Sequence, residues 1–148
     1  MTKHERVLRI FLRIIGTAAA LALFCVLFPY SWMNAIHEQL GMGELPRAPI
    51  VGYLARCTSA FYALLGGLLW VLSFNVRRFR PVLIYAAIAI MGLGVILLAV
   101  DFIEGLPRFW SLWEGPINLS FGILIFWLST TLPPAAVADT SKASDLCP

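Results

Sequence analysis

Four ionisable residues stand in or beside apolar stretches of this chain, where charged side chains are rare: Arg56, Asp101, Glu104 and Glu114. In such surroundings a guanidinium and a carboxylate either pair with each other or face a ligand, an ion or a proton path. Arg56 lies about one helical turn, roughly 5 Å, from the start of its apolar stretch. Asp101 lies near the end of the next stretch, so that in two antiparallel helices both residues are at a similar depth from the same membrane face. We therefore predict a polar cluster at one membrane face, in which Arg56 pairs with Asp101 or Glu114.

Such a cluster fits three interpretations. As a structural tie between two helices, it needs only the ion pair, because an unpaired charge at that depth is costly. As a binding site, it would hold a ligand or an ion. As the acid or base of a membrane enzyme acting on lipid or quinone, Asp101, Glu104 and Glu114 would need a cleft around them.

Other chemistry is poorly supported by the sequence. His37, Glu38 and Glu44 are not spaced so that two of them become metal ligands on one helix face. Thr58 and Ser59 lack a nearby histidine, and the chain contains neither a nucleophile elbow nor a phosphate-binding glycine loop. We therefore expect no metal, no other cofactor and no catalytic residue.

The three cysteines, Cys25, Cys57 and Cys147, show no C-x-x-C spacing and no histidine at ligand distance along the chain. We expect them to be packing residues. A disulfide between Cys25 and Cys57 stays open, since both could lie in the same half of the membrane facing an oxidising compartment.

The elements that must position these residues are four apolar stretches, at 14–33, 53–74, 82–103 and 117–132. A hydrocarbon core of about 30 Å requires a helix of about 20 residues. With 60% hydrophobic residues, 13% charged residues and a mean hydropathy of +0.85, the composition argues against a soluble fold. We predict an all-α membrane protein, a four-transmembrane-helix antiparallel bundle forming one domain over residues 1–132.

The segments outside the spans have their own patterns. In the first outer loop Met33, Ile36 and Leu40 recur at helical spacing before Gly41, which predicts a short helix lying on the membrane surface. The loop at 75–81 is short enough to make the second and third spans antiparallel neighbours. The tail at 133–148 is poor in apolar residues and is expected to be disordered and cytoplasmic.

Basic residues predict the orientation. They gather before the first span and between the second and third: Lys3, Arg6, Arg9 and Arg13, then Arg77, Arg78 and Arg80. Loops rich in Lys and Arg stay cytoplasmic, so both termini are expected inside. Because the basic residues behind the net charge of +3 lie beside the span ends, they report orientation, and we expect no nucleic-acid partner. The basic start also resembles a signal peptide, but no small-residue cleavage site follows, so we expect the first span to be retained.

Small residues predict where helices approach each other. Ser59, Ala63 and Gly67 recur every four residues and form one stripe, which predicts a helix-packing face toward another span or a second copy. In the first span Gly16 and Ala20, and in the third Gly92 and Gly94, offer similar surfaces, for which we expect internal packing.

Three runs resemble a family of small bacterial four-span integral membrane proteins of unknown function: IHEQLGMG at 36–43, YLAR at 53–56, and DFIEGLP at 101–107 with WEGP at 113–116. The resemblance covers roughly residues 34–122 and leaves out the first span and the tail. It implies a multi-pass protein of the bacterial cytoplasmic (inner) membrane and a role for Arg56, Asp101 and Glu114, but no reaction.

Three classes of function follow. A non-catalytic accessory or scaffold subunit, which packs with other membrane subunits or with itself in the lipid bilayer, agrees with all these features. A small oligomeric transporter or channel needs ionisable groups near the membrane midplane, where these stretches are apolar. A lipid- or quinone-binding membrane enzyme needs an acidic site on the outer face. We expect the first.

Overall fold

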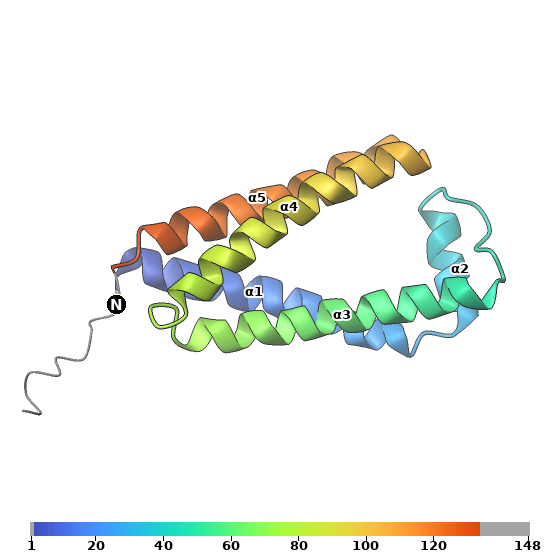
Figure 1. The fold of residues 1–148 in the computed structure, drawn as a ribbon. Coiled ribbons are helices and arrows are strands. Elements are labelled where there is room, and N and C mark those ends of the chain that lie inside the picture. Colours follow the sequence, from blue (N-terminus) through green and yellow to red (C-terminus); the bar gives the residue numbers. More distant parts are fainter. Residues whose placement is uncertain (1, 134–148) are drawn as a thin grey trace, which may run out of the picture.

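The computed structural model describes residues 2–133, and all regular secondary structure in this range is helical. The five helices are α1 (Lys3–Val26), α2 (Tyr30–Gln39), α3 (Pro49–Phe74), α4 (Arg80–Glu104) and α5 (Arg108–Thr130) (Figure 1). Among the described residues, three helices are long and apolar enough to cross a membrane: α1, α3 and α4. α5 has 23 residues, but its first half is less apolar, so four spans are not established.

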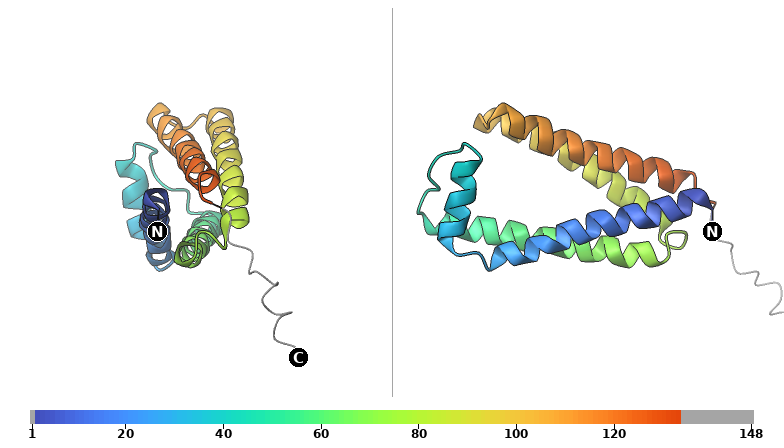
Figure 2. Two further views of the ribbon diagram at one scale, coloured as in Figure 1. Left: turned by 90° about the vertical axis from the view of Figure 1, so that its left-hand side faces the viewer. Right: turned by 180° about the vertical axis from the view of Figure 1, so that it is seen from behind.

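The four long helices form two pairs. α1 packs along α3, and α4 packs along α5, while α1 and α5 touch much less (Figure 1). The pairs meet near residue 3 and the 75–79 loop, which we call the closed end, and diverge toward α2 and the 105–107 turn, which we call the open end (Figure 2). The expectation that the second and third spans pack as neighbours is wrong, because each has its main contact with another helix.

The hydrophobic core lies in the closed half of the molecule. Its members come from the first three turns of α1, the first two turns of α4, the last turns of α3 and α5, and the residues just after α3 and α5: Leu8, Leu12, Leu69, Leu72, Val76, Leu83, Ala87, Ile125, Leu128 and Leu132. The other half of each pair has no share in this cluster. Tertiary packing between the pairs is therefore concentrated at one end.

Polar contacts also fasten the closed end. Glu5 is 6% exposed, and its carboxylate accepts from Arg77 with an Nη2–Oε2 distance of 2.8 Å, while Arg9 Nη2 lies 3.5 Å from the other oxygen. Arg80 donates to the Ser129 and Thr130 carbonyls, satisfying the last turn of α5. Both basic clusters thus lie at the same end of the bundle.

Each pair closes through glycine. A Cβ added to Gly66 of α3 would lie 2.5 Å from the Gly16 carbonyl oxygen of α1, so the two backbones are in direct contact. In the other pair a Cβ on Gly94 would lie 2.8 Å from the Gly115 carbonyl oxygen. The internal packing expected for Gly16 and Gly94 is confirmed, whereas Gly92 has nothing within 4 Å.

The predicted packing face behaves differently within this chain. Ser59 and Ala63 are half-buried, but Gly67 is exposed and has no neighbour within 4 Å. The close approach of α3 to α1 runs through the preceding residue, Gly66. Packing of the Gly67 stripe against a second copy stays a prediction.

Two helices, α1 and α5, differ most from the predicted spans. The first helix begins at Lys3, where the Thr2 hydroxyl accepts from the Glu5 amide, and it ends at Val26 instead of continuing to 33. Pro29 cannot donate a helical hydrogen bond and starts α2 as its N-cap. α5 begins at Arg108 instead of 117, so Pro116 lies inside it.

The short helix predicted in the first outer loop is present as α2. It ends at Gln39, and Gly41 follows with a positive φ of 75°, as the sequence pattern indicated. The Asn34 amide oxygen accepts from the Leu45 backbone amide at 2.7 Å, and the Tyr30 hydroxyl donates to the Leu45 carbonyl. These bonds fold the 40–48 loop back onto α2. The tail predicted to be disordered lies, from residue 134 onward, outside the described residues.

Candidate functional site: an Asp101 cavity and an apolar window

The predicted polar cluster is not assembled. Arg56 donates from Nε to the Val26 carbonyl at 3.0 Å and from Nη2 to the Phe28 carbonyl at 3.2 Å. The ion pairs within residues 2–133 are the two made by Glu5, so the tie to Asp101 or Glu114 is wrong. The last carbonyls of a helix lack partners in the helix itself, and Arg56 supplies one for Val26, the last residue of α1, and for Phe28 just beyond it.

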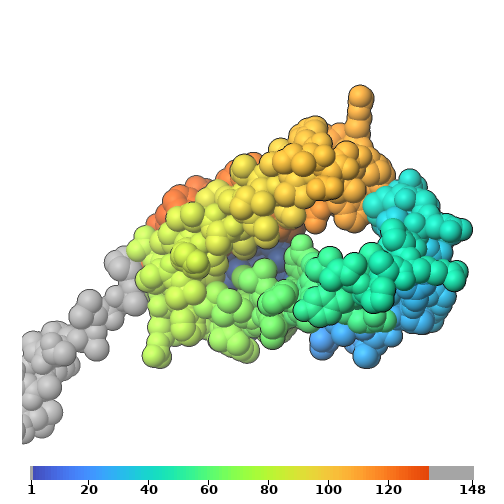
Figure 3. Space-filling view, turned by 45° about the vertical axis from the view of Figure 1, so that its right-hand side comes forward, coloured from blue at the N-terminus to red at the C-terminus, as the bar shows by residue number. Residues whose placement is uncertain are grey.

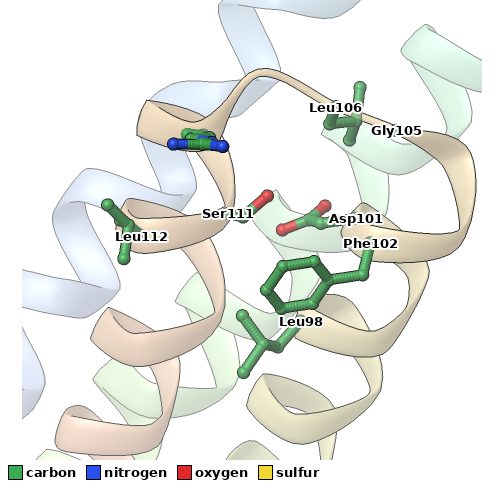
Figure 4. A pocket seen from close by; sticks show the side chains of 8 residues that line it. Leu98, Asp101, Phe102, Gly105, Leu106, Ser111 and Leu112 are labelled. Carbon is green, nitrogen blue, oxygen red and sulfur yellow. The ribbon is translucent and has the colours of Figure 1, made fainter.

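Asp101 lies in the interface between α4 and α5. The residue is 2% exposed, and its Oδ2 is buried without a hydrogen-bond partner within the described residues. The Asp101 carboxylate and the Ser111 side chain face each other in Figure 4. The backbone carbonyl of Asp101 accepts from Gly105 and Leu106, which closes the helix at the turn.

A cavity of about 340 Å³ opens beside this carboxylate. Its polar lining comes from Asp101, Arg108 and Ser111, and its apolar lining includes Leu98, Phe102 and Leu112 (Figure 4). The site thus combines one buried acceptor, one guanidinium and an apolar wall.

The other two acids of the predicted cluster lie apart from it. Glu104, the last residue of α4, is exposed. Glu114 does not open a helix as expected but stands in the second turn of α5, where its Oε2 accepts from Trp110 Nε1 at 2.6 Å. The expected benefit from a helix N-terminus therefore does not apply to Glu114.

A second feature is the opening between the two helix pairs, which we call the window. Figure 3 shows it between α3 and α4, with α2 at its far side. At its narrow end lies a cavity of about 310 Å³ lined by all four long helices, with Ala18, Leu65, Leu93 and Phe121 among its apolar residues. Tyr62 and Asn118 are its polar members.

The described residues were compared with the needs of a metal site and of a disulfide. Within residues 2–133 no three His, Cys, Asp or Glu side chains lie close enough together to hold a metal ion. Cys25 and Cys57 are both free thiols, so the disulfide left open by the sequence is not formed in this structure. Cys147 lies outside the described residues.

Sequence reasoning missed several residues that the structure brings forward. Arg108 and Ser111 line the Asp101 cavity. They could have been found from the sequence only by starting the last helix before Pro116, which places both of them on α5. Glu5 was overlooked among its basic neighbours, although an acid surrounded by arginines is a candidate for pairing.

No family model, curated protein or solved structure matches this chain.

Proposed function

We propose that this chain is a non-catalytic, multi-pass membrane protein of the bacterial inner membrane, and that it is an accessory or scaffold subunit. Its window receives an apolar segment of a membrane partner. The observation that carries this proposal is the one-ended core, which leaves apolar faces of both helix pairs uncovered toward the open end.

Packing in lipid supports this role. Lipid tails are as apolar as leucine, so helices associate through close contact and small residues rather than through burial from water. The window offers Ala18 and Ala19 beside larger apolar side chains, which allow a helix backbone to approach. Exposed Gly67 on the other side of α3 offers a further close-contact point for a second copy.

A transporter is less well supported. Alternating access or conduction needs ionisable groups at a midplane cavity, and the window lining within the described residues carries only the neutral polar groups of Tyr62 and Asn118. The acidic enzyme site also loses support, since Asp101, Glu104 and Glu114 do not converge.

Four membrane crossings belong to the proposal. α5 packs along α4, and its last turn reaches the closed end with α1, so a crossing by α4 favours a crossing by α5. The arginines and Lys3 at the closed end favour the cytoplasm for that end.

This topology predicts the location of reporters. Fusions after Pro148 and before Met1 are both expected to place their reporter in the cytoplasm. A control fusion in the 40–48 loop should place its reporter on the far side of the membrane. If the C-terminal reporter also appears on the far side, α5 does not cross and the four-span proposal fails.

The partner role predicts a crosslinking pattern. A photoreactive amino acid in place of Leu93, which lines the window, is expected to crosslink to another polypeptide in native membranes. The matched control replaces Val95, which is exposed and lies about 200° around the same helix. A protein adduct confined to the Leu93 probe supports the proposal. Lipid adducts alone at both positions would refute it and favour a lipid-filled window.

A further inference from the structure

The Asp101 cavity is separate from the window and is not explained by helix packing. A buried polar group without a partner costs free energy comparable to a lost hydrogen bond, and a carboxylate costs more. Asp101 Oδ2 is such a group, although the interface around it otherwise consists largely of apolar side chains. A ligand that donates a hydrogen bond to Asp101 would remove this cost.

The cavity lies at headgroup depth if α4 crosses the bilayer. From Arg80 to Asp101 the helix rises about 32 Å, close to the thickness of about 30 Å for a hydrocarbon core. Leu98 lies about one turn deeper, toward the hydrocarbon, whereas Arg108 begins the next helix beyond the turn. The polar end of the cavity therefore faces the lipid headgroups, and the apolar wall faces the acyl chains.

Charge selects the kind of headgroup. Asp101 accepts hydrogen bonds from a cation that carries N–H groups, and Arg108, which makes no ion pair within the described residues, has the guanidinium geometry that can bind a phosphate. A headgroup that contains both a primary ammonium and a phosphate satisfies the two residues together. An anionic glycerol headgroup offers only the phosphate, and a choline headgroup has no N–H to donate.

We propose that the cavity formed by Asp101, Arg108 and Ser111 binds a zwitterionic phospholipid with a primary amine, that is, a phosphatidylethanolamine. The ammonium donates to Asp101, the phosphate accepts from Arg108, and one acyl chain lies along Leu98, Phe102 and Leu112. The proposal goes beyond the accessory role and is independent of what occupies the window.

The first experiment uses the unmodified full-length protein. It is purified in mild detergent, and phosphatidylethanolamine, phosphatidylcholine or phosphatidylglycerol with identical acyl chains is added in turn. Bound lipid is then counted by native mass spectrometry. We expect phosphatidylethanolamine to bind about tenfold more tightly than the other two, the difference expected for one charge-assisted hydrogen bond. Equal binding of the ethanolamine and choline lipids would overturn the proposal.

The second experiment uses variants. Asp101→Asn is expected to abolish the preference for the ethanolamine lipid, and Arg108→Gln, at an exposed position, to weaken binding of all three lipids. Glu104→Gln is the matched control, because Glu104 is exposed one turn further along α4. If Asp101→Asn does not fold, Arg108→Gln and the comparison of lipids on the unmodified protein still decide. A preference retained in folded Asp101→Asn would overturn the assignment.

A third measurement separates the lipid from its free headgroup. Soluble phosphoethanolamine is added at concentrations from that of the lipid up to a large excess while bound phosphatidylethanolamine is counted. The lipid is expected to stay bound, because the apolar wall holds its chain. Full displacement by phosphoethanolamine at concentrations comparable to the lipid would show that a soluble metabolite is the ligand and would overturn the assignment to a membrane lipid.

Discussion

Gly66→Ala is expected to lower the thermal stability of the protein in detergent by several degrees. The added Cβ would lie 2.5 Å from the Gly16 carbonyl oxygen and 2.6 Å from the Ala20 amide nitrogen, and both atoms belong to the backbone of α1. Neither can rotate away, so α1 and α3 must separate over their whole contact. Overpacking of this kind costs about 1–3 kcal/mol, and contact between a rigid pair of backbones favours the upper part of that range.

The matched control is the next residue. Gly67→Ala adds the same atom to the same helix, but nothing lies within 4 Å of its Cβ. Its melting temperature should be unchanged or slightly raised, since alanine favours the helix over glycine. Melting curves of the two variants, followed by circular dichroism, provide the comparison. Equal losses in both would mean that α1 and α3 do not meet through Gly66.

Glu5→Gln is expected to have the second large effect, because it removes the charge that joins α1 to the loop between α3 and α4. Glu5 is 6% exposed and lies 2.8 Å from Arg77, with Arg9 at 3.5 Å. Breaking a fully buried ion pair costs about 3–5 kcal/mol. The Arg77 side chain is 39% exposed, so solvent screens part of the interaction and we expect about 2 kcal/mol.

A double-mutant cycle measures this pair directly. Glu5→Gln, Arg77→Gln and the double variant are compared by thermal denaturation in detergent, and the sum of the single losses should exceed the double loss by about 1 kcal/mol or more. Glu44→Gln, at an exposed position, is the control for loss of a carboxylate. Additive losses would show that Glu5 and Arg77 do not interact across the closed end.

The sequence predicted the helices better than their partners. Long apolar stretches are dictated by composition and length, so α3 and α4 lie within a few residues of the predicted spans, and the basic clusters indicated which helix ends lie together. The pairing of helices depends on which face each one presents. Adjacent glycines differ by about 100° around a helix, and spacing alone could not choose Gly66 over Gly67.

The prediction of a polar cluster was wrong for a related reason. Depth along a helix can be counted from the sequence, and similar depths suggested that Arg56 meets Asp101. Contact also requires that α3 and α4 stay together at that depth, and the divergence of the two pairs separates them. Arg56 instead binds the end of α1, the helix with which α3 packs. Only a tertiary arrangement could supply that distinction.

A bundle whose core is confined to one half responds unequally to the two leaflets of its bilayer. At the closed end, lateral pressure acts on tightly packed side chains and an ion pair, which resist compression. At the open end the same pressure acts on two helix pairs that are held together only at the closed end. The angle between the helix pairs should therefore follow acyl-chain crowding in a single leaflet. Thinning or stretching that leaflet would change the separation of the two pairs at the open end.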